Sequence, residues 1–172
     1  TSKVEIFENR VDLEKTSISN RSTKVFTLNG IADSTMRLLG GSKGKKLSTE
    51  EKEMIKEFWE TVSKNIPEWQ LLLKDKVSAH ELRKGFIHTN TNVLNALGIV
   101  GHTIMEEFPD TWKEKLRGLK NIDWSRSNPE WQGRLIINGQ MLKNARGIEL
   151  AANTIMQKCG VKLPENRKKY ES

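Results

Sequence analysis

An apolar pattern of helical period between residues 89 and 108 constrains the fold more than any other feature of the sequence. The apolar residues recur at spacings of three and four, which places Val93, Leu97, Val100, Ile104 and Phe108 on one face of a helix. Gly98 and Gly101 interrupt this pattern, although a glycine inside a helix costs about 1 kcal/mol relative to alanine. We therefore expect a long helix whose glycines let a neighbouring helix approach closely.

Shorter patterns of the same period predict further helices before and after this segment. Ser48 and Glu51 have the spacing of a capping box, Thr27 is a plausible N-cap, and Gly160 follows the last pattern as a helix stop. We predict a mainly α fold: a single helical domain, residues 1–172, of about six helices. It has at most a small β element, for which "KVEIF" and "RLIIN" are the candidates. We expect residues 160–172 to form a frayed tail.

The charge of the chain favours a polyanionic partner. Its 172 residues carry a net charge of +7, and residues 113–146 hold eight basic but only three acidic residues. No apolar run approaches the ~20 residues of a membrane-spanning helix, so we expect no membrane partner. The single cysteine, Cys159, excludes an internal disulfide, which indicates the cytoplasm. Its place among apolar residues of helical spacing predicts a core position rather than a reactive thiol.

The stretch "GGSKGKK" at residues 40–46 raises the question of a phosphate-binding P-loop. A P-loop has two glycines separated by four residues, then Lys and a Ser or Thr, and it follows a strand. Here Gly40 and Gly44 enclose three residues, Lys45 is followed by Lys46, and the preceding segment is helical. The P-loop is excluded, and Lys43, Lys45 and Lys46 remain as cations suited to backbone phosphates.

Separated polar segments supply the other candidate phosphate contacts. The Ser- and Thr-rich segment 15–24 carries Arg21 and Lys24, and such hydroxyls and cations are typical of loops that contact phosphates. Arg126, Arg134, Lys143 and Arg146 stand in or beside turns farther along the chain. We predict that these residues, with Lys43, Lys45 and Lys46, bind DNA if the fold brings them to one side.

Two features have a functional and a structural interpretation. Amides at the helix start after His88 would bind an anion, or Thr89 or Asn90 simply caps that helix. Trp124 and Trp131 would stack on nucleic acid, or they pin a long loop to the helices. No histidine, cysteine or carboxylate spacing predicts a metal site, a nucleophile or a cofactor, so we expect no enzyme.

Four stretches resemble the C-terminal part of the DndB family of DNA sulfur modification proteins. They are "VDLEKTSISNRSTKVFTLNGI", "ELRKGFIHTNTNVLNALG", "IDWSRSNPEWQGRLIINGQMLKN" and "IELAANTIMQKCGVKLP". The resemblance implies bacterial DNA phosphorothioation, in which sulfur replaces a non-bridging backbone oxygen. It also implies a regulator that binds the promoter of the modification operon rather than a sulfur-transferring enzyme. The family's Asp-Gly-Gln-His-Arg segment has no counterpart here; "INGQ" at 137–140 lacks the His-Arg pair.

Two functions follow from these observations. The first is a regulator that binds double-stranded DNA in the phosphorothioate modification system. The alternative is an interaction module that docks on its own N-terminal half, on another copy, or on other modification proteins. Its docking surfaces would be the Gly98 and Gly101 face and exposed tryptophans. Because the chain begins with Thr1 rather than Met, we expect a fragment or a processed product, and the resemblance implies the C-terminal part of a longer protein.

Overall fold

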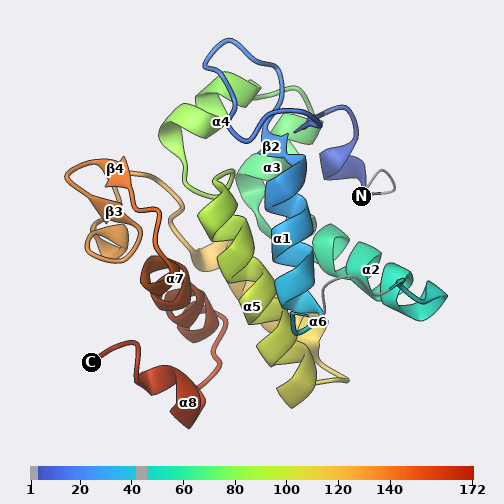
Figure 1. Ribbon diagram of the computed structural model, residues 1–172, viewed down its shortest axis with the longest axis vertical. Helices are drawn as coiled ribbons and strands as arrows, with labels where there is room; N and C mark the ends of the chain where they lie inside the picture. Colours follow the sequence, from blue (N-terminus) through green and yellow to red (C-terminus); the bar gives the residue numbers. More distant parts are fainter. Residues whose placement is uncertain (1–3, 42–45) are drawn as a thin grey trace.

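The computed structural model describes residues 4–41 and 46–172, and it is mainly helical, as predicted (Figure 1). The α-helices of this part are α1 (Leu28–Leu38), α2 (Thr49–Asn65), α3 (Pro67–Leu73), α4 (Ala79–Gly85), α5 (Thr91–Glu107), α6 (Trp112–Lys115), α7 (Ala145–Lys158) and α8 (Glu165–Lys168). Three 3₁₀ helices accompany them: η1 (Glu5–Phe7), η2 (Leu116–Asn121) and η3 (Pro129–Trp131). The strands are β1 (Val11–Asp12), β2 (Phe26–Thr27), β3 (Ile136–Ile137) and β4 (Gln140–Met141).

Helix α5 is the centre of the fold, and α1 lies beside it in the same direction (Figure 1). A Cβ atom on Gly98 would overlap the backbone carbonyl of Ser34 in α1. A Cβ atom on Gly101 would overlap Leu38 of α1 and Phe58 of α2. The predicted close approach at the two glycines is therefore confirmed. The same contacts bury this face inside the molecule, so the prediction that it serves as a docking surface is wrong.

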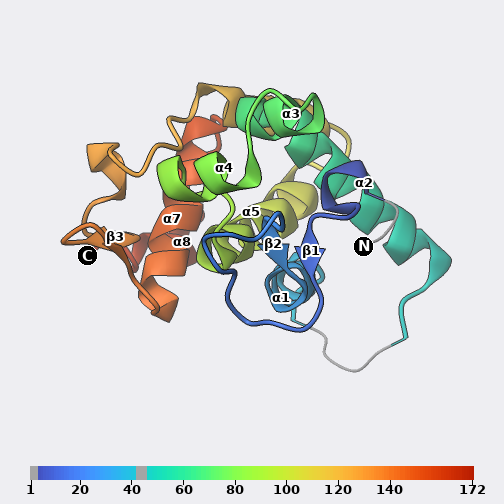
Figure 2. The ribbon, with the colours of Figure 1, turned by 90° about the horizontal axis from the view of Figure 1, so that it is seen from above.

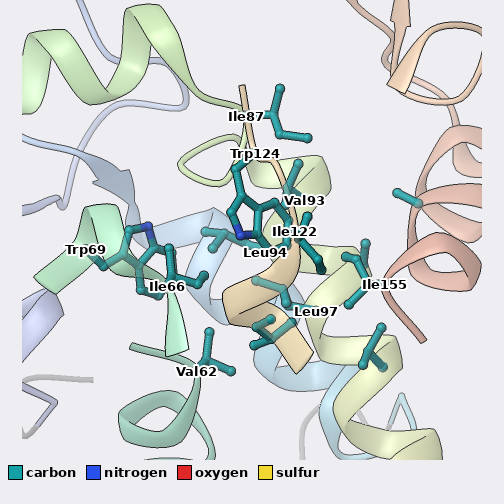
Figure 3. Close-up of a cluster of buried hydrophobic side chains, with 14 of the residues drawn as sticks. Val62, Ile66, Trp69, Ile87, Val93, Leu94, Leu97, Ile122, Trp124 and Ile155 are labelled. Atoms are coloured by element: carbon teal, nitrogen blue, oxygen red, sulfur yellow. The ribbon is translucent and has the colours of Figure 1, made fainter. Parts of the chain in front are cut away.

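The hydrophobic core forms where α2, α3, α5, α7 and the segment after α6 meet (Figure 3). Large aromatic rings fill it, and Trp59 and Trp69 are at most 1% exposed. Cys159 belongs to this cluster, as predicted, and burial raises the pKa of its thiol to about 12. None of the helices in the described ranges is long and apolar enough to cross a membrane.

The β structure is two short pairs of strands rather than one element. β1 and β2 are parallel, and the loop between them, residues 13–25, runs past the start of α1 (Figure 2). β3 and β4 form an antiparallel hairpin, because Asn138 and Gly139 adopt the positive φ angles of a tight turn. "RLIIN" thus contains a strand, as expected, whereas the described part of "KVEIF", residues 4–7, contains η1 (Glu5–Phe7) instead of a strand.

The C-terminal segment, expected as a frayed tail, packs onto α7 instead. Arg167 is only 8% exposed; its Nε donates to Asn153 Oδ1 at 2.7 Å, and its Nη2 donates to Glu149 Oε2 at 2.7 Å. Asn153 donates in return to the backbone carbonyl of Arg167. Val161 is also buried. A buried, hydrogen-bonded arginine holds α8 in place, which the polar composition of the segment did not indicate.

Candidate nucleic-acid interface

A cleft of about 670 Å³ opens at the N-terminal ends of α1, α5 and α7. Its walls are the loop 13–25, the segment that leads into α5, Arg126, and residues 141–148. Four of its lining residues are basic: Arg37, Arg83, Arg126 and Lys143. None of the described residues that line it is acidic. The cleft therefore concentrates positive charge in one concave place.

Three helix N-termini add to this positive potential. The N-cap residues of α1, α5 and α7, which are Thr27, Asn90 and Asn144, all line the cleft. Each side chain accepts a hydrogen bond from an amide of its own first turn, at 3.0, 2.9 and 2.7 Å respectively. A helix N-terminus carries roughly half a positive charge. The capping interpretation of Asn90 is thus confirmed, and the same helix start also faces the cleft.

Arg126 reaches the cleft because a buried aromatic pair fixes its loop. Trp124 and Trp131 stack with ring centroids 5.9 Å apart, and Trp131 Nε1 donates to the Asp123 carbonyl at 2.9 Å. Both rings are at most 1% exposed, so they pin the loop and cannot stack on a ligand. The guanidinium of Arg126 donates through Nε and Nη2 to the carbonyl of Arg83. Its Nη1 has no partner among the described residues.

Arg83 organises the opposite wall. Its guanidinium donates to the carbonyls of Ser19, Asn20, Ser22 and Lys24, which are all in the loop 13–25. Burial lowers the pKa of Arg83, but a guanidinium stays charged at neutral pH. Because both Nη groups of Arg83 are engaged by the loop, this residue mainly positions the loop and contributes charge to the cleft.

Arg37 and Lys143 are the least engaged cations of the cleft. Arg37 comes from the last turn of α1, and Lys143 stands just before the N-cap of α7. Neither side chain forms a hydrogen bond or an ion pair within the described part of the chain. Both are therefore available to an anion, together with Nη1 of Arg126.

A second part of the lining is apolar. Val25 and Ile148 are 1% and 6% exposed, so their side chains are fixed parts of the wall. Ile18 and Met141 are half-buried and complete this part of the lining. An anion in the cleft therefore meets hydrocarbon and a thioether as well as cations.

Two further predicted DNA contacts are occupied by the C-terminal segment. Arg134 forms a bidentate ion pair with Glu171, at 3.0 and 2.8 Å, and also donates to the carbonyl of Leu150. This contact raises the pKa of Arg134, and the hydrogen bond from Arg134 holds the pKa of Glu171 below its ordinary value. Arg146 donates to the carbonyls of Tyr170 and Ser172. Neither arginine lines the cleft.

The remaining predicted cations lie apart from the cleft. Arg21 is exposed and lines a separate hollow beside Asp75 and His80. Lys24 donates through Nζ to the carbonyl of Asn9 at 2.7 Å. Lys46 is exposed ahead of α2. Lys43 and Lys45 lie outside the described residues. Of the predicted set, the fold brings together Arg126 and Lys143 in the cleft.

A buried histidine steadies the chain where it enters α5. Trp69 Nε1 donates to His88 Nδ1 at 3.1 Å, and His88 Nε2 lies 3.4 Å from Glu68 Oε2. Burial lowers the pKa of His88 despite this neighbouring carboxylate. Burial also opposes ionisation of Glu68, but the contact with His88 keeps its pKa below the ordinary value. His88 is a packing residue, and it fixes the segment that continues into the helix start at the cleft.

Comparison with known protein families identifies the family to which this chain belongs. The family model DndB, described as DNA-sulfur modification-associated, matches residues 1–162. The chain belongs to the DndB family. No curated protein and no solved structure matched the chain. The match spans every element that lines the cleft, so the cleft is part of the DndB region itself.

Sequence reasoning missed two of the cationic residues of this DndB-family cleft. Arg37 and Arg83 lie in α1 and α4, and charged residues on such helices ordinarily face solvent. No local pattern distinguishes them, because their place in the cleft depends on the packing of α1 and α4 around α5.

In the described residues of this DndB-family chain, no group of three or more His, Cys, Asp or Glu side chains could hold a metal ion.

Proposed function

We propose that this DndB-family chain binds duplex DNA through the cationic cleft and thereby regulates the DNA sulfur modification system. The observation that supports this most strongly is a lining that holds Arg37, Arg83, Arg126 and Lys143, the N-caps of three helices, and no described acidic residue. Phosphates are the anions that such a combination of guanidinium groups and helix N-termini favours. The compartment of this function is the bacterial cytoplasm.

The available cations set the expected strength of the interaction. Arg37, Lys143 and one side of Arg126 are free to contact phosphates, while Arg83 holds the wall. Each phosphate neutralised contributes about −0.9 to the slope of log K against log salt concentration. Three contacts from the cleft therefore predict a slope of about −2.7, which surface lysines such as Lys46 would steepen. Affinity should fall about twentyfold for a threefold rise in salt concentration.

A regulatory role fits a DNA-binding chain better than a catalytic one. The buried thiol of Cys159, with its raised pKa, is a poor nucleophile. His88, the only histidine without solvent exposure among the described residues, is held by Trp69 and Glu68. In this proposal the activity of the chain is the binding of operator DNA. Contacts with other modification proteins remain a prediction.

The test is a salt titration of binding to duplex DNA, followed by a mobility-shift comparison. The titration uses fluorescence anisotropy with one labelled duplex over a range of salt concentrations. We expect a linear fall of log K with log salt. A slope near zero, or no binding at low salt, would contradict the proposal. A mobility shift with promoter DNA of the modification operon against shuffled DNA then tests the regulatory part. Equal affinity for both duplexes would leave only non-specific binding.

A further inference from the structure

The cleft combines a cationic surface and an apolar surface. Arg37, Arg126 and Lys143 supply positive charge, whereas Met141 and Ile148 contribute a thioether and hydrocarbon. A site that reads phosphate charge alone needs donors on all sides, because each phosphate oxygen is a strong acceptor. Thr, Ser and Asn side chains of the lining can donate to the oxygens that face them, but an oxygen that faces the apolar residues gains no hydrogen bond from them, and that costs affinity.

Replacement of one non-bridging oxygen by sulfur changes this balance. The phosphodiester keeps its single negative charge, so the attraction to the cations is retained. Sulfur is larger and more polarisable than oxygen and is a weaker hydrogen-bond acceptor. It therefore loses less hydration on contact with apolar side chains and gains more dispersion energy.

From this mixed lining we infer that the cleft binds a phosphorothioate linkage in preference to an ordinary phosphodiester. The remaining oxygen would face the cations, and the sulfur would face the wall formed by Ile18, Val25, Met141 and Ile148. This inference rests on the proposed function, because it assigns the form of DNA that the same cleft distinguishes. It would make the chain responsive to the extent of modification on the DNA to which it is bound.

The fixed geometry of the wall gives the selectivity a physical basis. Val25 and Ile148 are almost fully buried, and Val25 is followed directly by β2. The amide of Val25 donates to the carbonyl of Arg10 at 2.8 Å, which fixes its backbone. Arg83 holds the preceding residues of the loop. Val25 and Ile148 therefore hold a fixed apolar surface that offers no donor to an oxygen, so contact with this surface favours sulfur over oxygen.

The experiment compares three duplexes of one sequence: unmodified, and modified with each of the two phosphorothioate diastereomers. Sulfur stands at several successive linkages of one strand, so that every binding register presents it. Dissociation constants are measured by anisotropy at one low salt concentration. We expect one diastereomer to bind roughly tenfold more tightly than unmodified DNA, comparable to the effect of one methylene-sized group in an apolar pocket. Equal affinity for all three duplexes would overturn the inference and leave the proposed function intact.

Substitutions separate recognition by the wall from general adhesion of sulfur-containing DNA. Met141→Gln and Ile18→Gln place polar groups of similar size in the wall at half-buried positions, so either one provides the test should the other fail to fold. Both should bring the ratio of the two dissociation constants close to one. Lys143→Gln should weaken binding to all three duplexes by the same factor and keep the ratio. A preference for sulfur-containing DNA that survives both wall substitutions would overturn the inference. If the wild-type protein binds none of the three duplexes, the proposed function is overturned as well.

Discussion

Two pairs of cationic residues that are close together in the sequence have different surroundings in the structure. Arg126 and Lys143 line the cleft, where no described acidic residue faces them. Arg134 and Arg146 lie between and beside them in the sequence but are bound to the C-terminal segment, Arg134 by Glu171 at 2.8 Å. All four side chains have the same sign of charge, but Arg134 and Arg146 lie near the carboxylate of Glu171, whereas no described acidic residue lines the cleft beside the first pair.

The difference shows that availability, rather than number, decides what a basic segment can bind. A guanidinium in a bidentate ion pair has its directional donors occupied and its charge compensated. Release of that pair to bind a phosphate would leave the carboxylate of Glu171 beside another anion. The loop that carries Arg126 is held by buried tryptophans instead, and this kind of support leaves the charge uncompensated.

The largest expected effect comes from removal of that apolar support. Trp131→Ala should destabilise the protein by about 3 to 5 kcal/mol, as is typical when a buried tryptophan is truncated. Urea denaturation followed by circular dichroism measures the change. Trp112→Ala, at a half-buried position, is the matched control and should cost less. Equal losses for the two variants would show that the stacked pair is not the main support of the loop.

A smaller loss is expected when the wall of the cleft is released. Arg83→Met keeps the apolar stem but removes the donors to four carbonyls of the loop 13–25. Loss of charged hydrogen bonds of this kind costs about 2 kcal/mol. We expect the loop to become the first site of limited proteolysis, which mass spectrometry of the fragments would identify. Lys84→Met, on an exposed side chain of the same helix, should change neither property. An uncut loop in the Arg83 variant would contradict the role assigned to this residue.

The smallest effect concerns the occupied pair of arginines. Because Arg134 lowers the pKa of Glu171 in the folded protein, their contact stabilises the fold above the ordinary glutamate pKa. This contribution is lost as the pH falls through that value towards the lower folded pKa. Glu171→Gln should therefore cost about 0.5 to 1 kcal/mol at pH 7. The deficit should vanish at acid pH, below the lowered pKa of Glu171 in the folded protein, in urea titrations across pH. A deficit that is constant with pH would contradict the ion-pair account.

Much of the helical framework followed from local chemistry. The capping box at Ser48 and Glu51, the N-cap at Thr27 and the glycine stop at Gly160 each act within one turn, so the sequence alone identifies them. The close packing at Gly98 was also predictable, because glycines inside a strong helical pattern need a reason. The C-terminal segment was not, since Arg167 is buried only through Glu149 and Asn153, which are distant in the sequence.

The cleft was predictable only in part. Arg126 and Lys143 lie in turn-rich segments, where functional cations are common. Arg37 and Arg83 come from helices whose order in space depends on long-range packing, and no pattern in the sequence joins them. The engagement of Arg134 was equally hidden, because its partner Glu171 is 37 residues away. Local patterns identify which residues carry charge, and tertiary contacts determine which of these charges can contact a ligand.

The most direct test of this account compares two charge-matched double variants. Arg126→Gln with Lys143→Gln removes the open pair, and Arg134→Gln with Arg146→Gln removes the occupied pair. Circular dichroism first establishes that both variants are folded, and duplex DNA binding is then titrated against salt. The account predicts that the slope of log K against log salt falls in magnitude by about 2 for the open pair and stays at the wild-type value for the occupied pair. Equal changes in the two variants would show that the protein binds DNA through its overall charge and would contradict the role of the cleft.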